Sequence, residues 1–270
     1  MQKPDRRPIA VFDSGLGGLS VLACALELAP QEIYVYLADL ANAPYGERPL
    51  SRIRELVHED VRLLLTHDVK ALVVACNTAT ASCVALLRRE YPGLPIVGME
   101  PALKVAATRC PRGEAAVLAT PATLSLSMFA LLRSRCEPLV GVRPVPCAGL
   151  SDMIDHDADE NSLRDYLYGV LPPDDANVTS IVLGCTHYVL IAPLVKKLYP
   201  NKNVISGNEG TVRHMIDILK QNDLCAGDNP APTVEYLSTL AQDGIEARMR
   251  RVVSDAKARR VWENFFAAQK

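Results

Sequence analysis

Residues 181–195 read IVLGCTHYVLIAPLV: an apolar run, a glycine, three residues with polar or reactive side chains, and a second apolar segment. This pattern predicts a buried strand, a tight turn and a helix. The turn carries Cys185, Thr186 and His187, and a thiol there would lie near a helix N-terminus, whose partial positive charge favours the thiolate. A small cysteine packed at the end of a buried strand would give the same pattern. Taken alone, the stretch leaves both interpretations open.

An earlier stretch repeats this arrangement. Residues 73–98 read VVACNTATASCVALLRREYPGLPIVG and align with residues 182–207, VLGCTHYVLIAPLVKKLYPNKNVISG, with a slip of one residue. In each, a cysteine follows an apolar run, and the next segment ends in two basic residues, a variable residue and Tyr-Pro. In the first copy the turn consists of Cys76, Asn77 and Thr78. Self-similarity of this kind indicates duplicated α/β halves rather than one long sheet.

Strands and helices alternate along both halves. Residues 8–12 form the first predicted strand, before the glycine-rich loop Asp13–Ser20, and residues 115–119 form its counterpart in the second half. Alternating elements of this length predict parallel sheets with right-handed crossovers. The glycines of the loop would either let backbone N–H groups face a carboxylate or phosphate, or form a plain turn before a capped helix.

We therefore expect an α/β fold with two pseudo-symmetric domains, each a parallel sheet with helices on both faces, and an active site in the cleft between them. We place the first domain at residues 1–98 plus 207–270 and the second at residues 99–206. The tail, Asn208–Lys270, is mostly helical by its apolar period, with a break at Gly227–Pro232. Its helices are expected to pack back on the first domain.

In parallel sheets of this kind, ligands bind at the C-terminal ends of the strands, where both cysteines lie. If the halves face each other, the cleft carries Cys76 on one wall and Cys185 on the other. Two thiols on opposite faces of a small substrate suit removal of a proton from one side of a carbon and return of a proton to the other, which is racemisation or epimerisation. A thiol needs only modest help to supply thiolate at neutral pH, and the candidate helpers are Asp13 and His187.

The composition limits other possibilities. The chain has 270 residues, 49% of them hydrophobic, and a net charge of −2, so neither nucleic acid nor an anionic membrane is expected as a partner. The N-terminus lacks the apolar run of a secretory signal, and no stretch could span a bilayer. Eight widely spaced cysteines suit reduced thiols in the cytoplasm. Cys185 and His187 have no further metal ligands nearby, and no pyridoxal or nucleotide signature is evident, so we expect no metal and no cofactor.

Five motifs occur in order between Asp13 and Tyr188: DSGLGGLSV, APYGERP, VVACNTATA, PIVGMEPA and VLGCTHY. They resemble the corresponding motifs of bacterial glutamate racemases, in the cofactor-independent aspartate/glutamate racemase superfamily. The resemblance implies an isomerase that interconverts L- and D-glutamate and supplies D-glutamate for peptidoglycan. It also implies that Cys76 deprotonates the D-enantiomer, assisted by Asp13, and that Cys185 deprotonates the L-enantiomer, assisted by His187. Because family members are often dimers, we expect a homodimer.

The resemblance also marks substrate contacts and departures. The family usually has a glutamate near Asp155 that helps the second thiol, so Asp155 is a further candidate catalytic residue, with a shorter side chain. Leu40, Val189 and Ser206 also depart from the family pattern, but they remove no proton-transfer group. The positions that match the family's substrate-contacting residues are Asp13, Ser14, Tyr45, Gly46, Asn77, Thr78, Thr186 and His187.

Several alternatives remain open at this point. An enzyme with a one-thiol reaction on a related scaffold, such as a decarboxylase or hydantoin racemase, is the main rival, although a decarboxylase is expected to lack one of the two cysteines. A Cys–His amidase should keep its activity when Cys76 is lost. A solute-binding protein with paired α/β lobes would leave the two thiols unexplained. Within the superfamily, aspartate is the alternative substrate.

Overall fold

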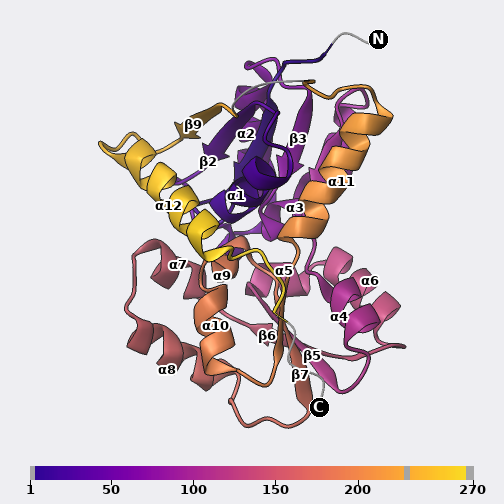
Figure 1. The fold of residues 1–270 in the computed structure, drawn as a ribbon, viewed down its shortest axis with the longest axis vertical. Helices are drawn as coiled ribbons and strands as arrows, with labels where there is room; N and C mark the ends of the chain where they lie inside the picture. Colours follow the sequence, from indigo (N-terminus) through magenta and orange to yellow (C-terminus); the bar gives the residue numbers. More distant parts are fainter. Residues whose placement is uncertain (1–3, 228–231, 266–270) are drawn as a thin grey trace.

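The computed structural model describes residues 4–227 and 232–265, whose strands form two separate parallel sheets (Figure 1). The strand order is β4-β3-β1-β2-β9 in the first sheet and β6-β5-β7-β8 in the second. The first sheet contains β1 (Ile9–Asp13), β2 (Tyr34–Ala38), β3 (Ala71–Val74), β4 (Ile96–Gly98) and β9 (Val234–Ser238), and the second contains β5 (Glu114–Ala119), β6 (Gly141–Pro146), β7 (Val178–Leu183) and β8 (Asn203–Ser206). The predicted α/β fold with two parallel sheets is confirmed.

The first sheet is covered on both faces because its strands are apolar on both sides. In β1, Ile9 and Val11 pack into one apolar cluster, while Ala10 and Phe12 pack into the other. The helices α1 (Leu19–Leu28), α11 (Asn208–Gln221) and α12 (Ile245–Arg259) belong to the first cluster, and α2 (Leu50–Leu65) and α3 (Asn77–Glu90) belong to the second. Figure 1 shows α1 between α11 and α12, which explains why α1 is buried on nearly all sides.

The second sheet is covered in the same way. One face carries α4 (Leu103–Arg109), α5 (Pro121–Ser125) and α6 (Ser127–Cys136), and the other carries α7 (Leu150–Asp155), α8 (Glu160–Val170), α9 (Thr186–Leu190) and α10 (Ala192–Leu198). The repeated Tyr-Pro ends a helix in each half, since α3 stops at Tyr91 and α10 at Tyr199. The buried Tyr199 hydroxyl donates to the carbonyls of Leu167 and Leu171, which fixes α10 against α8.

The tail differs from the prediction at one element. Residues 234–238, expected to be helical, form β9, the edge strand that pairs in parallel with β2. β9 is short and only partly buried, so its apolar residues show no clear period. The predicted break at Gly227–Pro232 lies largely outside the described residues.

No described helix combines the length and apolar character needed to cross a membrane. The division of the chain at residues 98 and 206 stays a prediction.

Candidate active site

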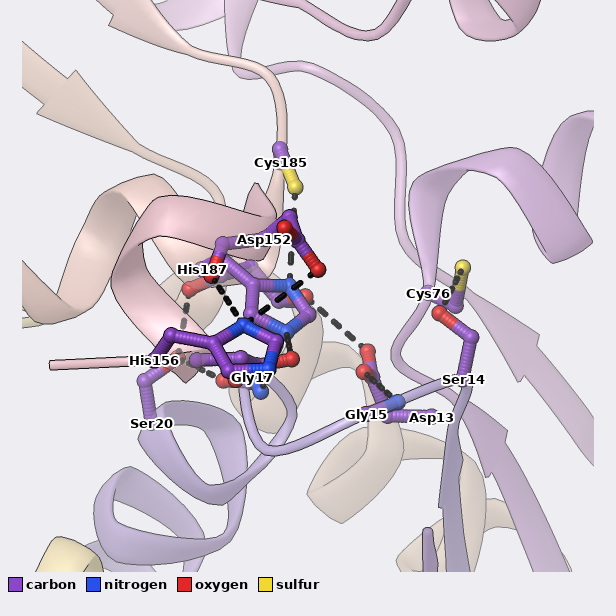
Figure 2. Close-up of polar contacts among 12 residues, drawn as sticks. Asp13, Ser14, Gly15, Gly17, Ser20, Cys76, Asp152, His156, Cys185 and His187 are labelled. Atoms are coloured by element: carbon purple, nitrogen blue, oxygen red, sulfur yellow. Dashed lines mark hydrogen bonds and ion pairs between the residues drawn. The ribbon is translucent and has the colours of Figure 1, made fainter. Parts of the chain in front are cut away.

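Cys76 and Cys185 lie on opposite walls of one small cavity between the two sheets. Cys76 follows β3 and caps the N-terminus of α3, and Cys185 follows β7 and precedes α9. Figure 2 shows Ser14 beside Cys76 and His187 beside Cys185. The enclosed space is about 20 Å³, room for about one water molecule, so the walls must move apart to admit a substrate.

The structure brings nearly all of the predicted site residues to this cavity. Of the predicted site residues, only Asp13 does not line the cavity. Five further residues line it, and two of these, Thr120 and Ser151, have polar side chains. The hydroxyl-rich turn before α5 is a sequence signal for Thr120, but none points to Ser151. Within residues 4–227 and 232–265, no group of three or more His, Cys, Asp or Glu side chains is arranged to hold a metal ion. The predicted residues that line the cavity are Ser14, Tyr45, Gly46, Cys76, Asn77, Thr78, Asp155, Cys185, Thr186 and His187.

The surroundings of Cys76 keep its thiol protonated. Its Sγ lies 3.5 Å from Ser14 Oγ and accepts the backbone N–H of Ala79 at 3.4 Å. Burial, and after it the charge of Asp13, raises the pKa of the Cys76 thiol to about 12. The N-terminus of α3 therefore does not by itself produce a thiolate in the closed cavity.

Asp13 joins the two halves behind the cavity. Its Oδ1 accepts the backbone N–H of Gly15 and its Oδ2 accepts the Thr186 hydroxyl, both at 2.9 Å. Burial raises the pKa of this fully buried carboxyl group, while the neighbouring His187 opposes that rise. Because Thr186 comes from the second sheet, the hydrogen bond ties β1 of one half to α9 of the other.

The surroundings of Cys185 differ, because a paired histidine lies beside the thiol. His187 Nδ1 lies 3.8 Å from Cys185 Sγ, and His187 Nε2 lies 2.9 Å from Asp155 Oδ2. Burial opposes the charged imidazole, but the charge and hydrogen bond of Asp155 outweigh it and raise the pKa of His187 well above its ordinary value. The protonated ring can therefore stabilise a Cys185 thiolate. Asp155 acts on that thiol through His187.

The glycine-rich loop makes room for His187. A Cβ at Gly17 would lie 2.5 Å from both the backbone N and Nδ1 of His187, and a Cβ at Gly15 would lie 2.8 Å from Nε2. The Gly15 N–H is bound by Asp13, and the Gly17 N–H faces His187 Nε2 at 3.3 Å. Both N–H groups are therefore engaged with protein atoms in this loop. Its glycines serve the close approach of the other half.

Asn77 is the side chain with the most hydrogen-bonding capacity left for a substrate. Both polar atoms of its amide are buried without a partner among the described residues. The Thr78 hydroxyl, in contrast, lies 3.1 Å from Thr120 Oγ1 and 3.0 Å from Thr123 Oγ1. Thr78 therefore joins the two halves on the Cys76 side, as Thr186 does on the other side.

Tyr45 lines the cavity, but its hydroxyl is held elsewhere. Tyr45 Oη lies 2.5 Å from Asp39 Oδ2 and 3.0 Å from Asp60 Oδ2, and neither acid lines the cavity. Tyr45 and Gly46 belong to the short helix η1 (Tyr45–Glu47), and both residues line the cavity.

Arg248 binds the C-terminal end of α7, at Asp155. Its guanidinium, on α12, donates to the backbone carbonyl of Asp155 and lies 3.4 Å from Asp157 Oδ2. The tail of the chain is thereby tied to the residue that pairs with His187.

Comparisons with known proteins identify the family of this chain. Residues 20–215 match the model of the Asp/Glu/Hydantoin racemase family. The glutamate racemase of Clostridium perfringens is 41% identical over 249 residues, which cover 91% of this chain and 96% of that protein.

Solved structures are similar over the same span. Glutamate racemase isoform RacE1 from Bacillus anthracis has a TM-score of 0.83 at 28% identity, covering 93% of this chain and 95% of its own. Escherichia coli glutamate racemase, in complex with L-glutamate and the activator UDP-MurNAc-Ala, has a TM-score of 0.80 at 26% identity, with 91% and 95% covered. The chain therefore belongs to the Asp/Glu/hydantoin racemase family and is an amino-acid racemase.

Proposed function

We propose that this enzyme interconverts L- and D-glutamate by a two-base proton transfer between Cys76 and Cys185. The observation that carries the proposal is the placement of the two thiols on opposite walls of one cavity. The relatives over most of the chain are glutamate racemases, and the Escherichia coli enzyme binds L-glutamate. These likenesses favour glutamate over aspartate or a hydantoin as the substrate.

In the direction from L to D, the Cys185 thiolate removes the α-proton and the Cys76 thiol donates its proton to the opposite face of the α-carbon. The reverse direction exchanges the two roles. The raised pKa of Cys76 suits a proton donor, and the charged His187 suits a neighbouring thiolate. One proton leaves the substrate and one enters it, so the reaction needs neither an oxidant nor a cofactor.

The substrate is held by groups from both halves. The free amide of Asn77 and the hydroxyl of Ser14 are proposed to bind the amino-acid end together with Thr78 and Thr186. The backbone around Tyr45 and Gly46 closes the same cavity. We further propose that the enzyme acts in the cytoplasm as a homodimer and that its D-glutamate supplies peptidoglycan synthesis.

Incubation of the enzyme with L-glutamate in deuterated water tests the reaction. The expected D-glutamate carries deuterium at the α-carbon, while the remaining L-glutamate stays protiated at early times, because each thiol serves one face only. Circular dichroism and proton NMR measure the two quantities. Equal early labelling of both enantiomers would contradict the two-base reaction. Faster turnover of L-aspartate would move the substrate to another member of the superfamily.

A further inference from the structure

The substrate-side turn at Tyr45 and Gly46 is attached to two buried acids that the proposed reaction does not use. Asp39 follows β2 and is 0% exposed, and Asp60 lies on α2 and is 5% exposed. The Tyr45 hydroxyl contacts both carboxyl groups, at 2.5 Å and 3.0 Å respectively. On the opposite side, a Cβ at Gly46 would lie 2.8 Å from Thr120 Cβ, so the turn is fixed between α2 and the second half.

The hydrogen bonds of Tyr45, Asp39 and Asp60 require a proton on one of the two acids. Asp39 Oδ1 accepts from Thr239 Oγ1 at 2.6 Å and from Asn42 Nδ2 at 2.9 Å, whereas among the described residues Tyr45 is the one side-chain donor that reaches Asp60. The phenol has one proton, which it donates to Asp39 over the shorter distance. A phenol proton donated to Asp39 cannot also be donated to Asp60, so the contact of Tyr45 Oη with Asp60 Oδ2 needs a second proton. We assign this proton to Asp60, because Asp39 already accepts from two other donors and Asp60 does not.

The charges around the pair favour the same state. Burial, and after it the charge of Asp39, raises the pKa of Asp60 to about 7, and the neighbouring Glu59 adds to the rise. Arg52 acts on Asp39 from a distance, but its guanidinium is paired with Glu55 at 3.0 Å. Among the described residues, no Lys, Arg or His forms an ion pair with Asp39 or Asp60. Without its proton, Asp60 would therefore face a second carboxylate.

We propose that Asp60 is a positioning residue: its protonated carboxyl group, joined to Asp39 and Tyr45, holds the turn at Tyr45 and Gly46 against the substrate. Loss of the proton sets two carboxylates against each other behind the turn and weakens substrate binding. The proposal rests on the proposed racemase function, and it concerns binding rather than the transfer of the α-proton. It predicts an effect on KM and leaves kcat nearly unchanged.

The test compares KM and kcat for L-glutamate between pH 6 and pH 8 in wild type, Asp60→Asn and Glu59→Gln. If only the protonated form binds, the wild-type KM rises roughly tenfold over this interval. Asp60→Asn is expected to keep the low KM at both pH values, because its amide donates as the protonated acid does. Glu59→Gln removes an exposed neighbouring charge that adds to the rise of the Asp60 pKa, so its KM should begin to increase at a slightly lower pH than that of wild type.

The melting temperature reports the protonation of Asp60 independently of an activity assay. Folded Asp60 keeps its proton up to about pH 7, whereas in the unfolded chain it loses the proton near pH 4, so this group's contribution to stability is lost as the pH rises between these values. The Tm of wild type should therefore fall relative to that of Asp60→Asn from pH 5 to pH 8.

A flat wild-type KM profile, which needs no variant to fold, would overturn the role of Asp60. Identical wild-type and Asp60→Asn profiles would do the same, since they would assign any pH dependence to another group. These outcomes differ from failure of the proposed function, which would appear as the absence of racemisation by wild type at every pH.

Discussion

The two walls of the cavity share a backbone plan but differ in charge. Each thiol stands between a parallel strand and a helix, so the duplicated chain places the two sulfur atoms in equivalent positions. Around Cys76 the helix has 14 residues and the neighbours are a hydroxyl and a backbone N–H, whereas the helix after Cys185 has five residues and carries a histidine paired with an acid.

In the proposed reaction, the duplicated backbone sets the positions of the two thiols, and the neighbouring side chains make their electrostatic surroundings unequal. Burial and the charge of Asp13 raise the pKa of Cys76, whereas Cys185 lies beside His187, whose pKa Asp155 raises against the opposing effect of burial. The proposed reaction uses Cys76 and Cys185 in equivalent roles, although the charges around the two thiols differ.

Replacing His187 should remove the difference between the surroundings of the two thiols, and we expect it to lower kcat/KM more than the other changes around Cys185. His187→Gln is expected to lower kcat/KM by roughly 10³-fold, since an unassisted thiol is a weaker base and acid at neutral pH. The loss must be equal in both directions, because the two enantiomers have equal free energies. The substrate deuterium isotope effect should rise for L-glutamate and fall for D-glutamate, as the Cys185 step becomes limiting. Equal changes for both enantiomers would argue against the assignment of His187 to Cys185.

The glycine loop offers a second way to disturb the Cys185 side. Gly17→Ala places a methyl group within 2.5 Å of His187 and should displace the ring, lowering kcat/KM by roughly 10²-fold. Gly210→Ala is the matched control, because a Cβ there meets no atom within 4 Å. Steady-state racemisation by circular dichroism measures both. Unchanged activity of Gly17→Ala would show that His187 does not need its observed position.

Asp155 can be tested through pH. In wild type the raised pKa of His187 keeps the ring charged across the neutral range. Asp155→Asn removes the main cause of that rise, so the charged form should be lost at a lower pH, and activity relative to wild type should fall roughly tenfold between pH 6 and pH 8. Asp152→Asn, on the same helix and exposed, should leave the profile unchanged. Parallel profiles for wild type and Asp155→Asn would remove Asp155 from the pair.

The smallest effect is expected at Arg248. Arg248→Ala removes a hydrogen bond to the backbone of Asp155, worth about 1 kcal/mol, and should lower kcat/KM roughly fivefold. Arg248→Lys should recover part of this loss, and Arg251→Ala, exposed on the same helix, should have no effect. If Arg248→Ala changes Tm but neither kcat/KM nor its pH profile, the arginine serves only the packing of α12.

The sequence predicts the parts of this site that follow from local pattern. An apolar run before Cys76 and Cys185 is enough to place both thiols at the C-terminal ends of parallel strands, and the repeat indicates two similar halves. The hydrogen bond between Asp155 and His187 cannot be predicted from local pattern. The two residues are 32 positions apart and meet only through the packing of α7 on α9. The resemblance suggests the acid but not its route to the thiol.

Contacts across the halves are the least predictable. The loop glycines look like an anion site, and only the approach of His187 from 170 positions away shows their purpose. Asp60 lies in a regular amphipathic helix, where nothing marks it as buried beside Asp39 and Tyr45. β9 is missed because a short, partly exposed edge strand lacks a strong apolar alternation.

The most direct test of the central claim is racemisation of L- and D-glutamate by Cys76→Ser and Cys185→Ser. Each variant is expected to lose at least roughly 10³-fold in kcat/KM in both directions. Cys83→Ser and Cys147→Ser, which change buried thiols outside the cavity in the same halves, should stay near wild type. Full racemisation by either Cys76→Ser or Cys185→Ser would contradict the two-base mechanism.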